Sequence, residues 1–233
     1  MYTFAWIFAF CCALVLPIVL AVELCVRRKE NWKPLLFGAL TFTVFQGFVR
    51  LPALSTLSRT DWFGALRNAE PLVYTLFLGA TAAICEEGGR WLVMRFLLKK
   101  QREARDAVAF GVGQGGLEAV VILGMTAAAT LFSSSSEDAG SIPLVFASGT
   151  ERLFALAAQL GFSVMVMKSV RERKPLWLFL AFGLHTLIDF GMAYAAGFLG
   201  DSASIWAVEA CVGLLALAML RFMRREQEKE AAA

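Results

Sequence analysis

The sequence is poor in the residue types that most often build metal and disulfide sites. Among 233 residues there is one histidine, His185, and there are five cysteines, which all fall in apolar segments. These cysteines form neither a disulfide framework nor a CxxC metal motif. A metal site would therefore have to combine His185 with carboxylates, an oxygen-rich ligand set that is less typical of zinc.

Charged residues are also scarce. They make up 18% of the chain, whereas 58% of the residues are hydrophobic and the mean hydropathy is +0.64. This composition lies outside the range of soluble globular proteins and indicates an integral membrane protein. No segment resembles a DNA- or RNA-binding motif, so we expect no nucleic-acid partner. The net charge of +3 is instead assigned to loops that face anionic lipid.

Long apolar runs predict an all-α, polytopic membrane helix bundle with about seven transmembrane helices. The expected spans are 3–26, 35–55, 72–98, 106–131, 143–168, 175–198 and 203–222. We expect one helix-bundle domain over residues 1–222, followed by a charged cytoplasmic tail at 223–233.

The lysines and arginines predict the orientation of the bundle, because such residues concentrate in cytoplasmic loops. They follow the first, third, fifth and seventh spans, whereas the turns at 133–138 and 200–202 contain none. Arg59 and Arg67 lie in the remaining loop on the opposite side. The expected arrangement is a multi-pass protein of the cell membrane, with its N-terminus outside and its C-terminus in the cytoplasm.

Two adjacent acids and an arginine interrupt the third span. Ionisable residues inside a membrane helix are costly and most often functional. Because Arg90 follows Glu86 by four residues, it is predicted to neutralise Glu86 on the same helix face. Glu87 would then point about 100° away and be free for another partner. The alternative interpretation is an ion pair that only holds two helices in register.

Further polar residues lie at the same predicted depth on three other helices. Gln114 and Glu118 are four residues apart, as are His185 and Asp189, so each pair shares a helix face. Counted from the cytoplasmic helix ends, Gln114, Gln159, His185 and the acid pair lie roughly 12–17 Å deep. We therefore expect them to meet near the membrane midplane, within reach of a cytoplasmic cavity.

Each of these residues also has a structural interpretation. Gln114, Gln159 and His185 could serve only as hydrogen-bonding partners between helices. Glu151 and Arg152 lie nearer the outer end of the fifth span and are interpreted as a structural ion pair.

Carboxylates and a histidine in a water-accessible cavity suit hydrolysis. A glutamate can take a proton from water, while a histidine orients the water or stabilises developing charge. With a divalent metal, His185, Glu86 and Glu118 could instead be ligands. The residue types alone do not choose between these two mechanisms.

The order of these motifs resembles a known group of enzymes. Glu86-Glu87-x-x-Arg90, Phe110-x-x-x-Gln114 and His185-x-x-x-Asp189 resemble the EExxxR, FxxxH and HxxxN motifs of the CAAX-protease and bacteriocin-processing intramembrane peptidases. The first motif is one residue shorter here. With Gly-x-Gly-x-Gly-Gly-x-Glu at 111–118 and Glu-Arg at 151–152, the chain is more similar to the YhfC-type intramembrane metalloproteases.

The resemblance implies an intramembrane endopeptidase that cleaves a membrane-associated or lipidated peptide. It implies Glu86 or Glu87 as the water-activating base, His185 as a water- or metal-binding partner, and Asp189 as support on the oxyanion or metal side. Arg90 would hold the acidic motif. The predicted catalytic set is Glu86, Glu87, Arg90, Gln114, Glu118, His185 and Asp189.

The chain departs from the pattern at two positions. Gln114 stands where the second motif has histidine, and Gln159 stands where the YhfC-type pattern commonly has another. Glutamine cannot act as an acid or base near neutral pH and is a poor zinc ligand. The two glutamines therefore weaken the case for the divalent metal, such as zinc, that the resemblance implies. Two alternatives stay open: an impaired pseudoprotease that binds and scaffolds a membrane partner, and a small transport or substrate-capture component.

Overall fold

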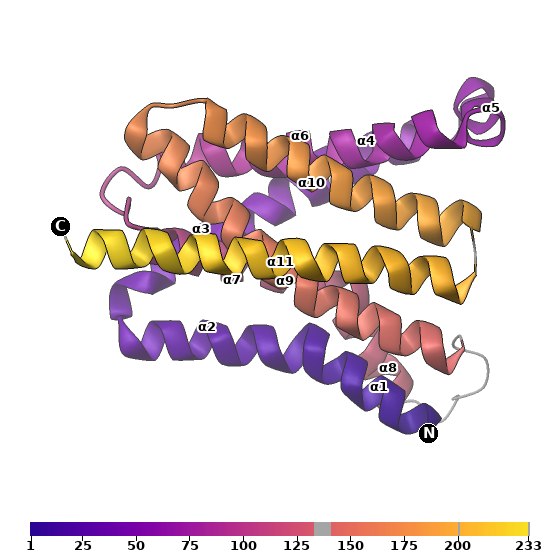
Figure 1. Ribbon diagram of the computed structural model, residues 1–233, viewed down its shortest axis with the longest axis horizontal. Helices are drawn as coiled ribbons and strands as arrows, with labels where there is room; N and C mark the ends of the chain where they lie inside the picture. The colour runs from indigo at the N-terminus through magenta and orange to yellow at the C-terminus, as the bar shows by residue number, and fades with distance from the viewer. Residues whose placement is uncertain (133–140, 200, 233) are drawn as a thin grey trace.

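The computed structural model describes residues 1–132, 141–199 and 201–232. In these ranges every regular element is a helix and there is no strand, so the all-α prediction is confirmed. The helices lie side by side, roughly along one axis (Figure 1). The serine-rich turn at 133–138, used above to predict orientation, lies outside the described residues.

In the described ranges, six helical stretches are long and apolar enough to cross a membrane. They are Tyr2–Arg27, Lys29–Leu57, Ala104–Phe132, Ile142–Glu172, Leu176–Leu199 and Ser202–Ala231. A seventh long helix, α6 (Pro71–Phe96), has 26 residues and carries the acid pair in its interior. The integral, multi-pass membrane character is therefore confirmed, while the count of seven spans and the orientation remain predictions.

Several of these stretches change helix type along their length. The N-terminal stretches consist of α1 (Tyr2–Phe10), η1 (Cys11–Val15) and α2 (Leu16–Arg27), then η2 (Lys29–Asn31), α3 (Trp32–Phe42), η3 (Thr43–Arg50) and α4 (Leu51–Leu57). The later ones are α7 (Ala104–Ala119), η4 (Val120–Gly124) and α8 (Met125–Phe132), then α9 (Ile142–Glu172), α10 (Leu176–Tyr194), η5 (Ala195–Leu199) and α11 (Ser202–Ala231). The segments η1, η3, η4 and η5 are π-helical. Such wider turns frequently mark functional sites, and η3 and η4 border the cavity described below.

A short helix, α5 (Asp61–Ala69), precedes α6 at the N-terminal end of the bundle (Figure 1). Phe63 is its buried residue, and this ring packs against Tyr74 and Phe77 of α6.

At the start of α11, Asp201 accepts hydrogen bonds from the backbone and side chain of Ser204, which lower the pKa of its carboxyl.

Glycines allow the closest helix contacts. A Cβ atom at Gly113 would collide with the backbone oxygen of Leu35, which places α7 directly against α3. A Cβ at Gly79 would lie 2.7 Å from the backbone oxygen of Thr186, which places α6 close to α10. Small residues allow this close approach in membrane bundles. These contacts bring the polar residues of different helices within hydrogen-bonding distance.

The interior of the bundle is formed mainly by α7 and α9. Among the membrane-length stretches, α9 is the most buried, and α7 buries nearly all of its residues. Outward-facing residues are large and apolar, for example Val19 and Val22 on α2 and Leu214 on α11. This distribution suits a lipid environment, because an apolar outer surface can face hydrocarbon.

One end of the bundle holds the C-terminus, and the other holds the N-terminus and α5 (Figure 1). At the first end, Arg28 and Arg105 contact Glu103, and Arg171 contacts Glu230. We call the first the basic end. It is held together by contacts between helix ends: Arg28 lies 3.2 Å from Asp106, and the backbone nitrogen of Ala104 donates to Glu230 over 2.7 Å.

The predicted cytoplasmic tail is a continuation of α11, which ends at Ala231. Glu226 is only 3% exposed and lies 2.8 Å from Nζ of Lys168 on α9. Arg171, one turn further along α9, forms an ion pair with Glu230. The tail therefore packs against the basic end of the bundle.

Candidate functional site

The predicted site residues from four helices form one buried polar cluster. Hydrogen bonds and short ionic contacts connect all seven of the predicted catalytic residues and Gln159. Close contacts at Gly79, which packs against α10, and at Gly111 and Gly115, which pack against α9, bring these helices together. The structure thus brings together every residue that the sequence predicted for the site.

Arg90 pairs with Glu87. Its Nη1 atom lies 2.9 Å from Oε1 and 2.7 Å from Oε2 of Glu87, and its side chain is 0% exposed. Nδ1 of His185 lies 2.7 Å from Oε1 of the same carboxylate. The prediction that Arg90 neutralises Glu86 and leaves Glu87 free is therefore wrong. Residues three apart and residues four apart both lie on the same helix face, so either acid could pair with Arg90. Contacts from neighbouring helices decide which acid does.

Glu86 is held by three glutamine amides. Its Oε1 accepts from Nε2 of Gln46, and its Oε2 accepts from Nε2 of Gln114 at 3.1 Å and of Gln159 at 2.7 Å. Within the described residues, no cationic side chain lies within ion-pair distance of this carboxylate. Hydrogen bonds from amides therefore provide the contacts that a buried carboxylate needs.

Arg90 also fixes the orientation of two of these amides. Its Nε donates to Oε1 of Gln114 at 3.3 Å, and its Nη2 donates to Oε1 of Gln159. Because a guanidinium has donors but no acceptors, each amide turns its oxygen to Arg90 and its NH₂ group to Glu86. Arg90 thus binds one acid directly and the other through two glutamines.

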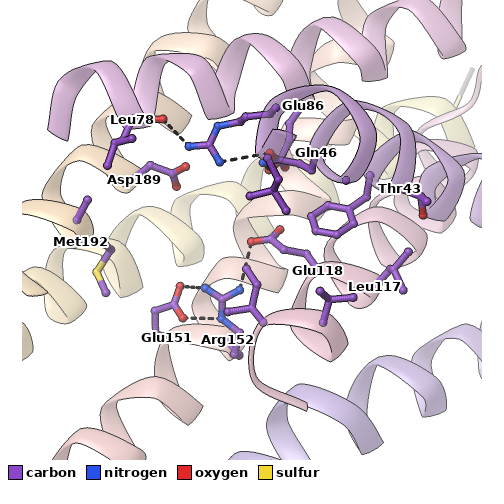
Figure 2. A pocket seen from close by; sticks show the side chains of 17 residues that line it. Thr43, Gln46, Leu78, Glu86, Leu117, Glu118, Glu151, Arg152, Asp189 and Met192 are labelled. Atoms are coloured by element: carbon purple, nitrogen blue, oxygen red, sulfur yellow. Dashed lines mark hydrogen bonds and ion pairs between the residues drawn. The ribbon is translucent and has the colours of Figure 1, made fainter. Parts of the chain in front are cut away.

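A cavity of about 540 Å³ adjoins this cluster (Figure 2). Glu86, Glu118 and Asp189 lie on its wall, but Glu87 and His185 do not. Gln159 donates to Oε2 of Glu118 at 2.8 Å as well as to Glu86, so it connects the two carboxylates. Of the two adjacent acids, Glu86 is the one that can meet a molecule in this cavity.

The cavity lies on the side of the cluster that faces away from the basic end. Its lining includes Leu78, which precedes Glu86 on α6, and Met192, which follows His185 on α10. Ile122 likewise follows Glu118. Since these helices alternate in direction, all three lie toward the N-terminal end of the bundle. The cavity beside the cluster therefore lies toward the end opposite to the one expected, and the assignment of the basic end to the cytoplasm stays a prediction.

Arg152 belongs to the cavity wall (Figure 2). It pairs with the adjacent Glu151, as expected, and its Nη1 also lies 3.2 Å from Oε1 of Glu118 on α7. The Glu151–Arg152 ion pair, interpreted from the sequence as structural, therefore also contacts a candidate catalytic residue.

Two residues of the second span were missed. Gln46 contacts Glu86, and Arg50 donates to Oε1 of Gln46 at 3.3 Å and to the backbone oxygen of Leu78 at 2.8 Å. Both residues line the cavity. The signal was present in the sequence, because Gln46 and Arg50 stand four residues apart in an apolar stretch, as Gln114 and Glu118 do.

His185 lies between two carboxylates. Its ring stacks on Phe162 with centroids 5.3 Å apart, and its Nε2 lies 3.6 Å from Oδ2 of Asp189. The Asp189 side chain is 36% exposed and reaches the cavity. His185 therefore contacts Glu87 at hydrogen-bonding distance and lies near Asp189, and Asp189 is the one of these two acids that lines the cavity.

The side chains do not fit a metal ion. In the part of the chain that the structure describes, no group of three or more His, Cys, Asp or Glu residues could hold one. The predicted ligands Glu86, Glu118 and His185 are directed instead to amides, to Arg152 and to Glu87. Amide NH₂ groups that point at Glu86 also oppose a cation there, because they present their positive ends.

The fold and the site together define a multi-pass membrane protein with a charged, hydrogen-bonded cluster beside a cavity. The family described as YhfC intramembrane metalloprotease matches residues 12–146 and 139–212, and the chain belongs to this family. It is 29% identical over 235 residues to the uncharacterized membrane protein YhfC of Bacillus subtilis (strain 168), covering 88% of this chain and 90% of that protein. No solved structure matches significantly. The predicted resemblance to the YhfC group is confirmed, and the relation to CAAX proteases stays a prediction.

Proposed function

We propose that this chain is an intramembrane peptidase in which Glu86 activates the attacking water. Membership of a family described as intramembrane metalloproteases supports peptide-bond cleavage. The observation that carries the proposal is the position of Glu86, which is buried among apolar helices and yet lies on the wall of a 540 Å³ cavity.

The hydrogen bonds of Glu86 leave room for one water molecule. A carboxylate has about four acceptor positions, two on each oxygen. The amides of Gln114 and Gln159 take both positions of Oε2, whereas Gln46 takes one position of Oε1. The remaining position on Oε1 can accept a proton from water as its oxygen attacks the peptide carbonyl carbon, and Glu86 then passes this proton to the leaving amine.

Two arginines on the cavity wall can stabilise the negative oxygen that forms in this step. Arg50 and Arg152 both line the cavity. Fixed donors act strongly in such a site, because little water is present to screen them. Glu118 and Asp189 complete the polar wall, and Asp189 lies 3.6 Å from Nε2 of His185.

The substrate is a membrane-associated or lipidated peptide. Leu51, Val121 and Ile122 line the cavity, and all three are exposed. In a bilayer such exposed apolar side chains face hydrocarbon, so a peptide segment in the lipid can approach the cavity from the side.

Cleavage of membrane peptides by the protein in liposomes tests the proposal. Replacing Glu86 with glutamine preserves the shape of the side chain and removes the base, so cleavage should fall by about 10²-fold or more. The matched control is Glu23→Gln, which removes an exposed carboxylate that pairs with Arg27 outside the cluster. Cleavage that Glu86→Gln leaves at the wild-type rate would refute Glu86 as the base.

A second candidate is a pseudoprotease that binds membrane peptides without cleaving them. The observation that favours it is the full use of Gln114 and Gln159 in holding Glu86, since neither amide can transfer a proton. Photo-crosslinking of a membrane peptide to Leu51 or Ile122, with no cleavage in any lipid tested, would support this function over the first.

A further inference from the structure

We infer that the site needs no resident metal ion, because Arg90 and the amides of Gln114 and Gln159 already do what a metal would do there. This inference rests on the proposed function and departs from the family description, which names a metalloprotease. Its test reads metal binding directly, so it does not depend on whether cleavage is observed.

The first task of a metal in such a site is to supply positive charge beside the acids. Glu86 and Glu87 are both buried, and the buried guanidinium of Arg90 lies beside them. It contacts Glu87 directly and reaches Glu86 through Gln114 and Gln159. The charge is therefore built into α6 itself.

The second task of a metal is to orient its ligands. Here the three donors on Glu86 come from α7, α9 and η3, and two of them are oriented by Arg90. The carboxylate is fixed from three elements of the bundle, as it would be by metal coordination. A metal ion would add no further constraint.

A metal ion would also find few free electron pairs. It binds through lone pairs of oxygen, nitrogen or sulfur, and the amide oxygens of Gln114 and Gln159 are directed at Arg90. On His185, Nδ1 contacts Glu87. Its Nε2 faces Asp189 at 3.6 Å, which leaves at most one histidine and one aspartate at that point, below the three protein ligands of a catalytic zinc site.

The direct test is metal content. The wild-type protein is purified from cells grown with added zinc and manganese, and bound metal is measured by elemental analysis beside Glu86→Gln. We expect far less than one metal ion per chain in both proteins and no rise in melting temperature on adding zinc. About one ion per chain in the wild type, lost in Glu86→Gln, would overturn the inference.

The converse variant tests whether the two glutamines are the reason that the site binds no metal ion. Histidines at positions 114 and 159 would place two imidazoles beside Glu86, a set of three ligands that suits zinc. We expect Gln114→His/Gln159→His to gain about one zinc per chain, with a zinc-dependent rise in melting temperature. The matched control is Gln227→His, on the tail of α11. A folded double variant that gains no more zinc than this control would count against the inference.

Discussion

Arg90 is the residue on which the buried cluster depends most. Its side chain is 0% exposed and donates to Glu87, Gln114 and Gln159. Replacing it with methionine keeps a long side chain in the same space but removes the charge and all of these donors. Glu87 would then be a buried carboxylate without a cation, and two amide oxygens would lose their partners.

The size of the effect follows from this loss. Removing one partner of a buried ion pair costs about 3–5 kcal/mol, because the other charge stays buried. For a chain of this length, each kcal/mol corresponds to a shift in melting temperature of about 2–4 °C. Arg90→Met should therefore lower the melting temperature by roughly 6–20 °C.

Thermal unfolding in detergent measures this shift, and two further variants make the result specific. Arg95 lies on the same helix, and its backbone oxygen accepts a hydrogen bond from Arg102. Arg95→Met keeps this backbone contact, so the melting temperature of this variant should change little. Glu87→Gln combined with Arg90→Met removes both charges and should restore stability by about 1–3 kcal/mol relative to additive effects. A melting temperature for Arg90→Met equal to that of Arg95→Met would refute the reasoning, as would strictly additive effects in the double variant.

Two further predictions concern packing and the C-terminus. Gly113→Ala should destabilise the protein by about 1–3 kcal/mol, because the added Cβ collides with the backbone of Leu35. The control is Gly88→Ala, which should be neutral or stabilising, because the added Cβ has nothing within 4 Å. Equal melting temperatures for the two variants would contradict the close contact of α3 and α7. Truncation after Phe222 should lower the melting temperature, because it leaves the buried Lys168 without Glu226, and Lys168→Met in the truncated chain should recover part of the loss. A truncated protein as stable as the full chain would show that this contact is unimportant.

Much of the architecture could be predicted from local patterns. The seven apolar ranges lie inside helical stretches to within two residues, the largest shortfall being at 72–98, where α6 ends at Phe96. Apolar run length is a property of consecutive residues and needs no knowledge of neighbours. The spacing of Gln114 with Glu118, and of His185 with Asp189, likewise predicted which residues share a helix face.

The partners of these residues could not be predicted in the same way. Glu86 and Glu87 both stand at spacings that allow contact with Arg90, and the sequence alone favoured the wrong one. The choice depends on Gln46, Gln114 and Gln159, which come from other helices and reach Glu86 but not Glu87. The tail at 223–233 is a similar case, since the burial of Glu226 depends on Lys168 of α9.

By itself, the sequence determined that this is an all-helical membrane protein and that a small set of polar residues lies in its interior, because both conclusions follow from composition and from spacing along single helices. Only the tertiary structure decided which acid binds Arg90, which way the glutamine amides point, and on which side of the cluster the cavity lies. These features depend on the rotation and direction of several helices relative to one another. Close packing at positions such as Gly79 and Gly113 sets that geometry, and no single helix encodes it.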